Sequence, residues 1–123
     1  MKCFFIFILS LTVLACNKKQ TAPDIPLSEF NDKARVMIGV VTKISKEQNI
    51  EKLKKIATYT QFARVVDCKD VLHECKHYND ILTKMIRYTE DGQFDNSERK
   101  DIQEKIQALK LEISQARQVL LER

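Results

Sequence analysis

Glycine, proline and tryptophan are nearly absent from this chain of 123 residues, which has two glycines, two prolines and no tryptophan. Sheet sandwiches and barrels need many turns, and phosphate-binding loops need clustered glycines, so this composition excludes both classes. A formal net charge of +4 is small for this length and is dispersed along the chain, so it gives no indication of nucleic-acid binding. The length allows one small domain.

An apolar run stands at the N-terminus behind one positive charge. Lys2 precedes 11 residues, positions 4–14, that only Ser10 and Thr12 interrupt. A membrane-spanning helix needs about 20 apolar residues, so this run has the pattern of a secretory signal peptide instead. We therefore expect residues 1–15 to be removed as a signal peptide.

The run ends in the sequence VLAC at positions 13–16, which resembles a bacterial lipobox. The resemblance implies that Cys16 carries a covalent lipid, palmitate included, and that the protein needs no other cofactor. Asn17, which stands where an Asp would favour inner-membrane retention, implies the periplasmic face of the outer membrane. Residues 16–27 then form a lipidated terminus and a flexible tether with a root-mean-square reach of roughly 15–20 Å. Ordinary signal-peptidase cleavage is the alternative, and it would give a secreted protein.

Two further cysteines, Cys68 and Cys75, remain after Cys3 leaves with the signal peptide. An oxidising compartment favours disulfides. On a continuous helix, residues seven apart lie about 10.5 Å apart along the axis, whereas a disulfide needs Cα atoms within about 7 Å. Three arrangements are open: an internal bond with a helix break near residues 67–70, a bond to a partner or a second copy, or two thiols on a packing stripe.

Residues 28–123 have the apolar periodicity of helices. We expect the first helix from Glu29 into the 40s, capped by Ser28, although the β-branched residues 36–44 are also compatible with a strand. The remaining boundary signals are Asn49 before a second helix, Asp67 or Asp70 before a third that ends near Thr89, Asp91-Gly92 as a turn, and Ser97 at the start of the last. The fold class is all-α, a bundle or helical hairpin of three or four helices.

The last helix carries the clearest pattern. Its apolar residues step by 4, 3, 4, 3 and 4 positions, as in a coiled-coil seam: Ile102, Ile106, Leu109, Ile113, Ala116 and Leu120. This seam has two interpretations. It is either part of the core of the bundle or a docking surface for a helix of another protein.

A basic cluster, Lys52, Lys54 and Lys55, lies in the second expected helix. Near an anionic membrane each basic residue contributes about 1 kcal/mol, so this cluster is compatible with a lipid-facing surface. A solvated helix face is the alternative.

His73 and His77 belong to an HExxH sequence, the zinc-binding pattern of many metalloproteases. We do not expect a metal site or an enzyme. Lys76 lies between the histidines, no third ligand follows at a recognisable spacing, and no sheet is expected that would hold a substrate. No other catalytic pattern is present.

The small size, the lipobox and the helical seams together resemble the outer-membrane lipoprotein subunit of two-component phage spanins. That resemblance implies a periplasmic domain that pairs with a coiled-coil inner-membrane partner and disrupts the outer membrane during host cell lysis. Alternatives are a secretin pilotin, a conjugative entry-exclusion lipoprotein, and a secreted non-enzymatic helical protein. The expected partners are the membrane, a helical protein, and a second copy of the chain; nucleic acid is not among them.

Overall fold

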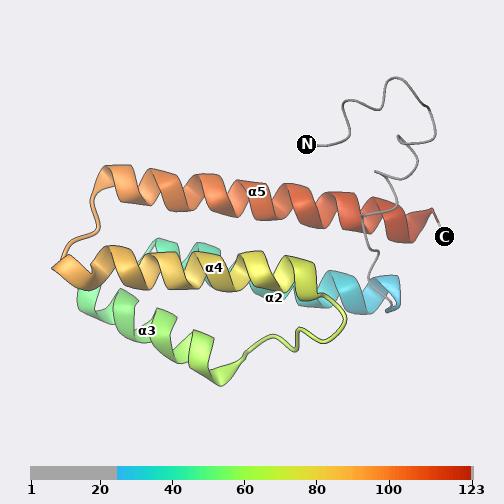
Figure 1. Cartoon of the computed structure of the whole chain (residues 1–123), viewed down its shortest axis with the longest axis horizontal. Coiled ribbons are helices and arrows are strands. Elements are labelled where there is room, and N and C mark those ends of the chain that lie inside the picture. The colour runs from blue at the N-terminus through green and yellow to red at the C-terminus, as the bar shows by residue number, and fades with distance from the viewer. Residues whose placement is uncertain (1–24, 123) are drawn as a thin grey trace, which may run out of the picture.

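The computed structural model describes residues 25–122 and consists of four α-helices joined by short connections (Figure 1). The expected all-α bundle is confirmed, and residues 36–44 are helical rather than extended. The elements are α2 (Leu27–Ser45), α3 (Ile50–Ala63), α4 (Leu72–Tyr88), the 3-10 turn η2 (Thr89–Asp91) and α5 (Asn96–Leu121).

The two C-terminal helices form an antiparallel hairpin, and the other two helices pack onto it (Figure 1). Helix α2 contacts both α4 and α5, so these three helices enclose the main core. Helix α3 contacts α4 and α2. In Figure 1, α3 lies on the side of α4 opposite to α5. One side of α3 is therefore left without a neighbouring helix.

The core is a continuous apolar cluster to which all four helices contribute. Its fully buried large side chains include Phe30, Met37, Leu53, Leu82, Met85, Ile106 and Leu109. Burying a Leu, Ile, Met or Phe side chain contributes about 1.5–3 kcal/mol, so this cluster is the main source of stability. Within residues 25–122, no helix has both the length and the apolarity needed to cross a membrane.

The start of α2 is two residues earlier than expected, whereas the start of α3 is at the expected place. Pro26, and not Ser28, occupies the N-cap position of α2, so Ser28 lies inside the first turn. Pro fits this end of a helix because its missing N–H would have no partner there. Asn49 caps α3 as expected, and its Oδ1 accepts a 2.9 Å hydrogen bond from the backbone N–H of Lys52.

The start of α4 is wrong in the sequence-based prediction. Neither Asp67 nor Asp70 caps it; the helix begins at Leu72, and Asp67 instead accepts a 3.1 Å hydrogen bond from the backbone N–H of Lys69. Helix α3 ends where Arg64 adopts the left-handed conformation, with φ of 52°. Residues 64–71 therefore form a non-helical loop, and α4 has only 17 residues.

The turn before α5 is at the expected place. Gly92 has φ of 82°, a conformation that glycine adopts without a steric penalty. The helix begins at Asn96 and is capped by Asp95 rather than Ser97. Asp95 and Glu98 form a capping box, because each side chain accepts a hydrogen bond from the backbone N–H of the other, at 2.8 and 3.0 Å.

Candidate functional site

The predicted lipidation site, Cys16, lies outside the described residues, as do the signal peptide and most of the tether. The described domain begins two residues before α2, at Ile25. Cys16 is eleven positions before the first residue of that helix.

Cys68 and Cys75 are brought together. Their sulfur atoms are within disulfide-bonding distance, and their Cα atoms are 5.7 Å apart. The pair closes the loop between α3 and α4, because Cys68 lies in that loop and Cys75 in the first turn of α4. Of the three arrangements that the sequence left open, the structure has the internal pair with a helix break.

The seam of α5 is core. Ile102, Ile106, Leu109, Ile113 and Leu120 are all buried, where α5 packs against α2 and α4. Of the two interpretations that the sequence left open for the seam, the structure has the core one. The 3.5-residue repeat that predicts a coiled coil also fits a helix packed in a bundle, because both need an apolar stripe along one side.

The two histidines of the HExxH sequence point to a carboxylate on the neighbouring helix. Glu112 of α5 places its Oε2 2.6 Å from Nε2 of His73 and its Oε1 2.5 Å from Nδ1 of His77. Neither contact is aligned as a hydrogen bond, so the attraction depends on the charge of the histidines. The cluster links α4 to α5.

Glu74, the second residue of the HExxH sequence, faces inward. It is 3% exposed, and burial raises the pKa of its carboxyl group, with a smaller contribution from nearby Glu112 and opposing ones from its backbone hydrogen bond and both histidines. In a metalloprotease the equivalent carboxylate activates a metal-bound water. No group of three or more His, Cys, Asp or Glu residues in the described chain is arranged to hold a metal ion.

Glu112 could not be identified from the spacing of the HExxH sequence, which indicates no third ligand. The available signal was its position on α5, next to the core residue Ile113 and three positions after Leu109. A charged residue at the edge of an apolar stripe needs a partner on the neighbouring helix.

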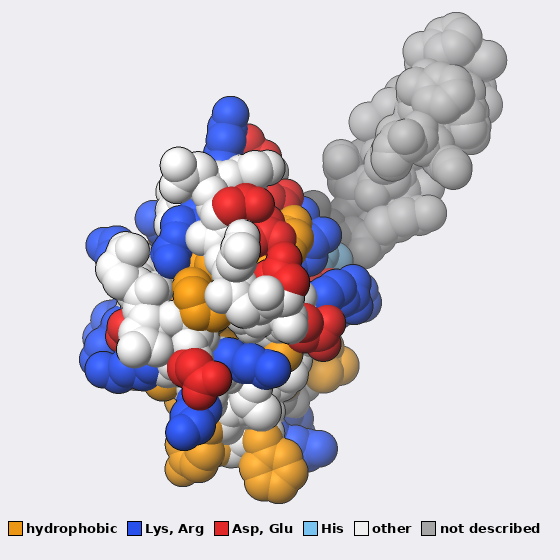
Figure 2. All heavy atoms as spheres, turned by 90° about the vertical axis from the view of Figure 1, so that its left-hand side faces the viewer, with side chains coloured by type: hydrophobic (Ala, Val, Ile, Leu, Met, Phe, Trp, Pro, Cys, Tyr) orange, Lys and Arg blue, Asp and Glu red, His pale blue; other side chains and the backbone are white. Residues whose placement is uncertain are grey.

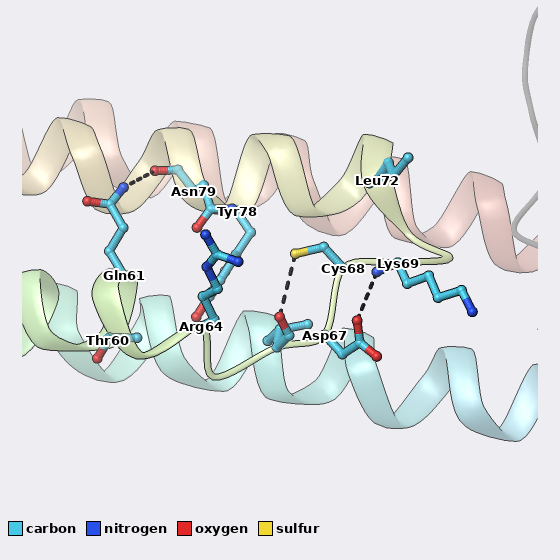
Figure 3. A pocket seen from close by; sticks show the side chains of 10 residues that line it. Thr60, Gln61, Arg64, Asp67, Cys68, Lys69, Leu72, Tyr78 and Asn79 are labelled. Carbon is cyan, nitrogen blue, oxygen red and sulfur yellow. Dashed lines mark hydrogen bonds between the residues drawn. The ribbon is translucent and has the colours of Figure 1, made fainter.

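A hollow of about 660 Å³ lies between the end of α3, the 64–71 loop and α4 (Figure 3). Its wall includes Gln61, whose Nε2 donates to the backbone oxygen of Asn79 at 3.3 Å and to Oγ1 of Thr83 at 2.6 Å. Two basic residues, Arg64 and Lys69, line the hollow as well. The hydroxyl of Tyr78, also in the lining, is buried without a hydrogen-bond partner, and burial raises its pKa.

The side of α3 that no helix covers carries exposed aromatic and basic residues, and we call it the α3 face: Lys52, Lys54, Lys55, Tyr59 and Phe62. Phe62 is 85% exposed and Tyr59 is 70% exposed. In Figure 2, hydrophobic side chains protrude at the bottom of the molecule, the side on which Figure 1 places α3, with basic side chains beside them. An exposed phenylalanine beside an exposed tyrosine is unusual for a helix that has only solvent to face.

The sequence indicates the α3 face only once the buried stripe of α3 is known. Leu53, Ala57 and Thr60 form that stripe. Tyr59 and Phe62 fall on the opposite side at 100° per residue.

No protein-family model, curated protein or solved structure matches this chain.

Proposed function

We propose that this protein is a lipoprotein, anchored through Cys16 on the periplasmic face of an outer membrane, that acts by binding another protein and not by catalysis. The observation that carries the proposal is the sequence VLAC at positions 13–16, directly after an apolar run of signal-peptide length. Two or three acyl chains on one cysteine give a stable anchor, whereas one chain gives only reversible binding.

The side-chain contacts of the HExxH sequence support a binding role for the described domain. The histidines of the HExxH sequence contact Glu112, and their neighbour Glu74 is buried. A metal-dependent hydrolase would need these groups around an open coordination position. A compact helical bundle without such a centre is suited to presenting a surface to a partner.

The more specific proposal is the outer-membrane subunit of a two-component phage spanin. Its support is the resemblance of the lipobox, the small size and the helical domain to that class. In this role the domain would bind the periplasmic coiled coil of an inner-membrane partner and bring the two membranes together during host lysis. Because the α5 seam is core, that partner would have to bind the exposed sides of the bundle.

Palmitate labelling in a bacterial host, wild type beside Cys16→Ser, tests the anchor. We expect label on the wild type only, and recovery of the labelled protein with the outer membrane. Label that persists in Cys16→Ser, or an unlabelled wild type, contradicts the proposal.

The spanin role is tested by co-expression with the product of the neighbouring reading frame. A short protein with an N-terminal membrane helix and a coiled coil should co-purify with the wild type, and the pair should complete lysis of the host. A neighbouring secretin or transfer gene would instead point to the pilotin or the entry-exclusion alternative.

A further inference from the structure

We propose that the α3 face is the surface on which the domain lies against the anionic phospholipid membrane that holds its N-terminus. This inference rests on the proposed function only in that the anchor keeps the domain at a membrane. It adds an orientation, because it states which side of the bundle meets the lipid and which sides remain available to a protein partner.

The first argument is the apolar content of this side. Besides Tyr59 and Phe62, Leu72 at the start of α4 is 71% exposed and lines the 660 Å³ hollow next to the end of α3. Figure 3 shows Leu72 at the edge of that hollow. Exposed aromatic and aliphatic side chains gain free energy when they enter the boundary between headgroups and acyl chains, which also suits the polar hydroxyl of tyrosine.

The second argument is charge. Among residues 25–122, Lys54 and Lys55 carry no ion pair within 4.0 Å, and Lys52 has only a loose contact with Glu47, at 3.7 Å. Arg64 and Lys69 line the hollow together with one acidic residue, Asp67, so its charged lining has a net positive charge. Glu51 is an exposed acidic residue at the start of the same helix. Basic residues around an apolar centre complement an anionic lipid surface.

The third argument is the position of the tether. Nζ of Lys33 donates a 2.7 Å hydrogen bond to the backbone oxygen of Asp67, so the loop that follows α3 lies against the second turn of α2. The six helical steps from Leu27 to Lys33 span about 9 Å. Eleven residues, the distance in sequence from Cys16 to Leu27, span at most about 40 Å. A lipid on Cys16 therefore leaves the α3 face within reach of the same membrane.

A partner helix would need the same apolar residues, but it would not need this proximity to the tether. A second copy of the chain would bring two basic faces together, which is unfavourable. The observations thus favour lipid over protein as the occupant. With α3 against the membrane, the exposed side of α5, which does not contact α3, remains open to a partner.

The absence of tryptophan from the chain allows a site-specific test. The full-length protein is reconstituted into vesicles of phosphatidylethanolamine and phosphatidylglycerol as two variants, Phe62→Trp and Leu111→Trp. Leu111 is the matched control, since it is also an exposed apolar residue, 60% exposed, but lies on α5. We expect the emission of Phe62→Trp to shift to shorter wavelength and to be quenched by brominated lipid, and that of Leu111→Trp to remain unchanged.

Charge is tested in the Phe62→Trp background by replacing Lys52, Lys54 and Lys55 together with Gln. Each basic residue near an anionic surface contributes about fivefold to binding, so the ratio of lipid-contacting to solvent-exposed domain should fall roughly a hundredfold. Vesicles of phosphatidylcholine alone should give the same loss without any substitution.

Any result in which brominated lipid quenches Phe62→Trp no better than Leu111→Trp overturns the inference. A blue shift of Phe62→Trp without lipid quenching also overturns it, and indicates a protein on the α3 face. Palmitate labelling of the same preparations separates the two proposals. If the protein is labelled but not quenched, the proposed lipid anchor stands and the proposed orientation is wrong. If it is quenched but not labelled, the orientation stands and the anchor is wrong.

Discussion

Tyr78 and Tyr88 lie on the same helix, and their hydroxyl groups have different surroundings. The hydroxyl of Tyr88 donates a 2.5 Å hydrogen bond to Oδ2 of Asp101 on α5. This bond raises the pKa of Tyr88 to about 12 and lowers the pKa of Asp101. The hydroxyl of Tyr78 is buried and has no hydrogen-bond partner in the part of the chain that the structure describes. One hydroxyl therefore stabilises the helical hairpin, whereas the other loses its hydration on folding without compensation.

Replacing each tyrosine by Phe tests this difference. We expect Tyr88→Phe to lower the free energy of unfolding at pH 7 by about 1 kcal/mol, since Asp101 is partly exposed and its hydrogen bond is screened. We expect Tyr78→Phe to leave it unchanged or to raise it by up to about 1 kcal/mol. Urea denaturation of both variants measures the effects, and equal losses would contradict the assignment.

The cost of Tyr88→Phe should also depend on pH. The lowered pKa of Asp101 means that the folded protein favours its ionised carboxylate. This contribution is present above the ordinary Asp pKa of 3.8 and is lost as the pH falls through the lowered value. The difference between wild type and Tyr88→Phe should therefore shrink in acid.

The pKa of Glu74 is shifted in the opposite direction to that of Asp101. Its raised pKa means that the folded protein favours the protonated form, an advantage that is present below the ordinary value of 4.5 and is lost as the pH rises through the raised pKa. Ionisation of this buried carboxyl group costs free energy. We expect Glu74→Gln to raise the free energy of unfolding at pH 7 by on the order of 1 kcal/mol, with little gain at pH 4.

Glu104, an exposed residue of α5, provides the control for Glu74→Gln. Glu104→Gln removes the same charge without relieving any burial, so it should change stability by less than about 0.5 kcal/mol. Thermal unfolding at the two pH values compares the variants. If Glu74→Gln is instead less stable than wild type at pH 7, the attraction between the Glu74 carboxylate and the two histidines outweighs the cost of burying it.

At the scale of the helices, the sequence predicts their existence better than their ends. The apolar stripes of α2, α4 and α5 are long, and a helix that buries such a stripe needs no other signal. Ends depend on single residues that compete. Ser28, Asp67, Asp70 and Ser97 are all good capping residues by type, yet none of them caps a helix here. Pro26, the left-handed Arg64, the Cys68–Cys75 pair and the Asp95–Glu98 box lie at these ends instead.

The capping box of α5 gives a direct test with a matched control. Asp95→Ala removes the acceptor for the backbone N–H of Glu98 and should lower the free energy of unfolding by about 1 kcal/mol. Ser97→Ala alters the residue that the sequence pattern favours as the cap, and it should change stability by less than about 0.5 kcal/mol. Chemical denaturation distinguishes the two, and a larger loss for Ser97→Ala would contradict the observed start of α5.

The candidate sites, like the helix ends, could be predicted from the sequence only in part. Cys68 and Cys75 could be named from the sequence, but their pairing required a helix break that no single residue announces. The HExxH sequence was visible, whereas its contact with Glu112 was not, because residues of different helices meet only through the packing of α4 against α5. The α5 seam was ambiguous because periodicity identifies an apolar stripe and not what covers it.

The core position of the α5 seam is tested by comparing Ile106→Ala with Leu111→Ala. Both residues lie on α5, but Ile106 is buried and Leu111 is exposed. We expect Ile106→Ala to cost about 2–5 kcal/mol through the cavity it leaves, and Leu111→Ala less than about 0.5 kcal/mol. If a partner helix covered the seam in place of the bundle, Ile106→Ala would weaken binding without this loss of stability in the isolated protein.

The described domain combines a main core between three helices with a fourth helix, α3, whose position depends on the loop beside it. Helices α2, α4 and α5 contact one another directly, while α3 contacts α4 and α2 and continues into the 64–71 loop. That loop is held near its middle, at two adjacent residues: Lys33 donates to the backbone oxygen of Asp67, and Cys68 pairs with Cys75. The position of the α3 face relative to α2 therefore depends on the loop.

Reduction of the Cys68–Cys75 pair should loosen this part of the molecule selectively. The pair closes a loop of about eight residues, and the chain-entropy relation gives about 2.5 kcal/mol for that length. We expect a reductant to lower the free energy of unfolding by about 2 kcal/mol and to reduce amide-exchange protection in α3 and the 64–71 loop. Helix α5 should keep its protection, since its core contacts are with α2 and α4.

The double variant Cys68→Ala, Cys75→Ala should match the reduced wild type and should not respond to reductant. A wild type that is equally insensitive would mean that the two cysteines are not joined, and loss of protection in all four helices together would mean that α3 and the loop belong to the same cooperative unit as the core.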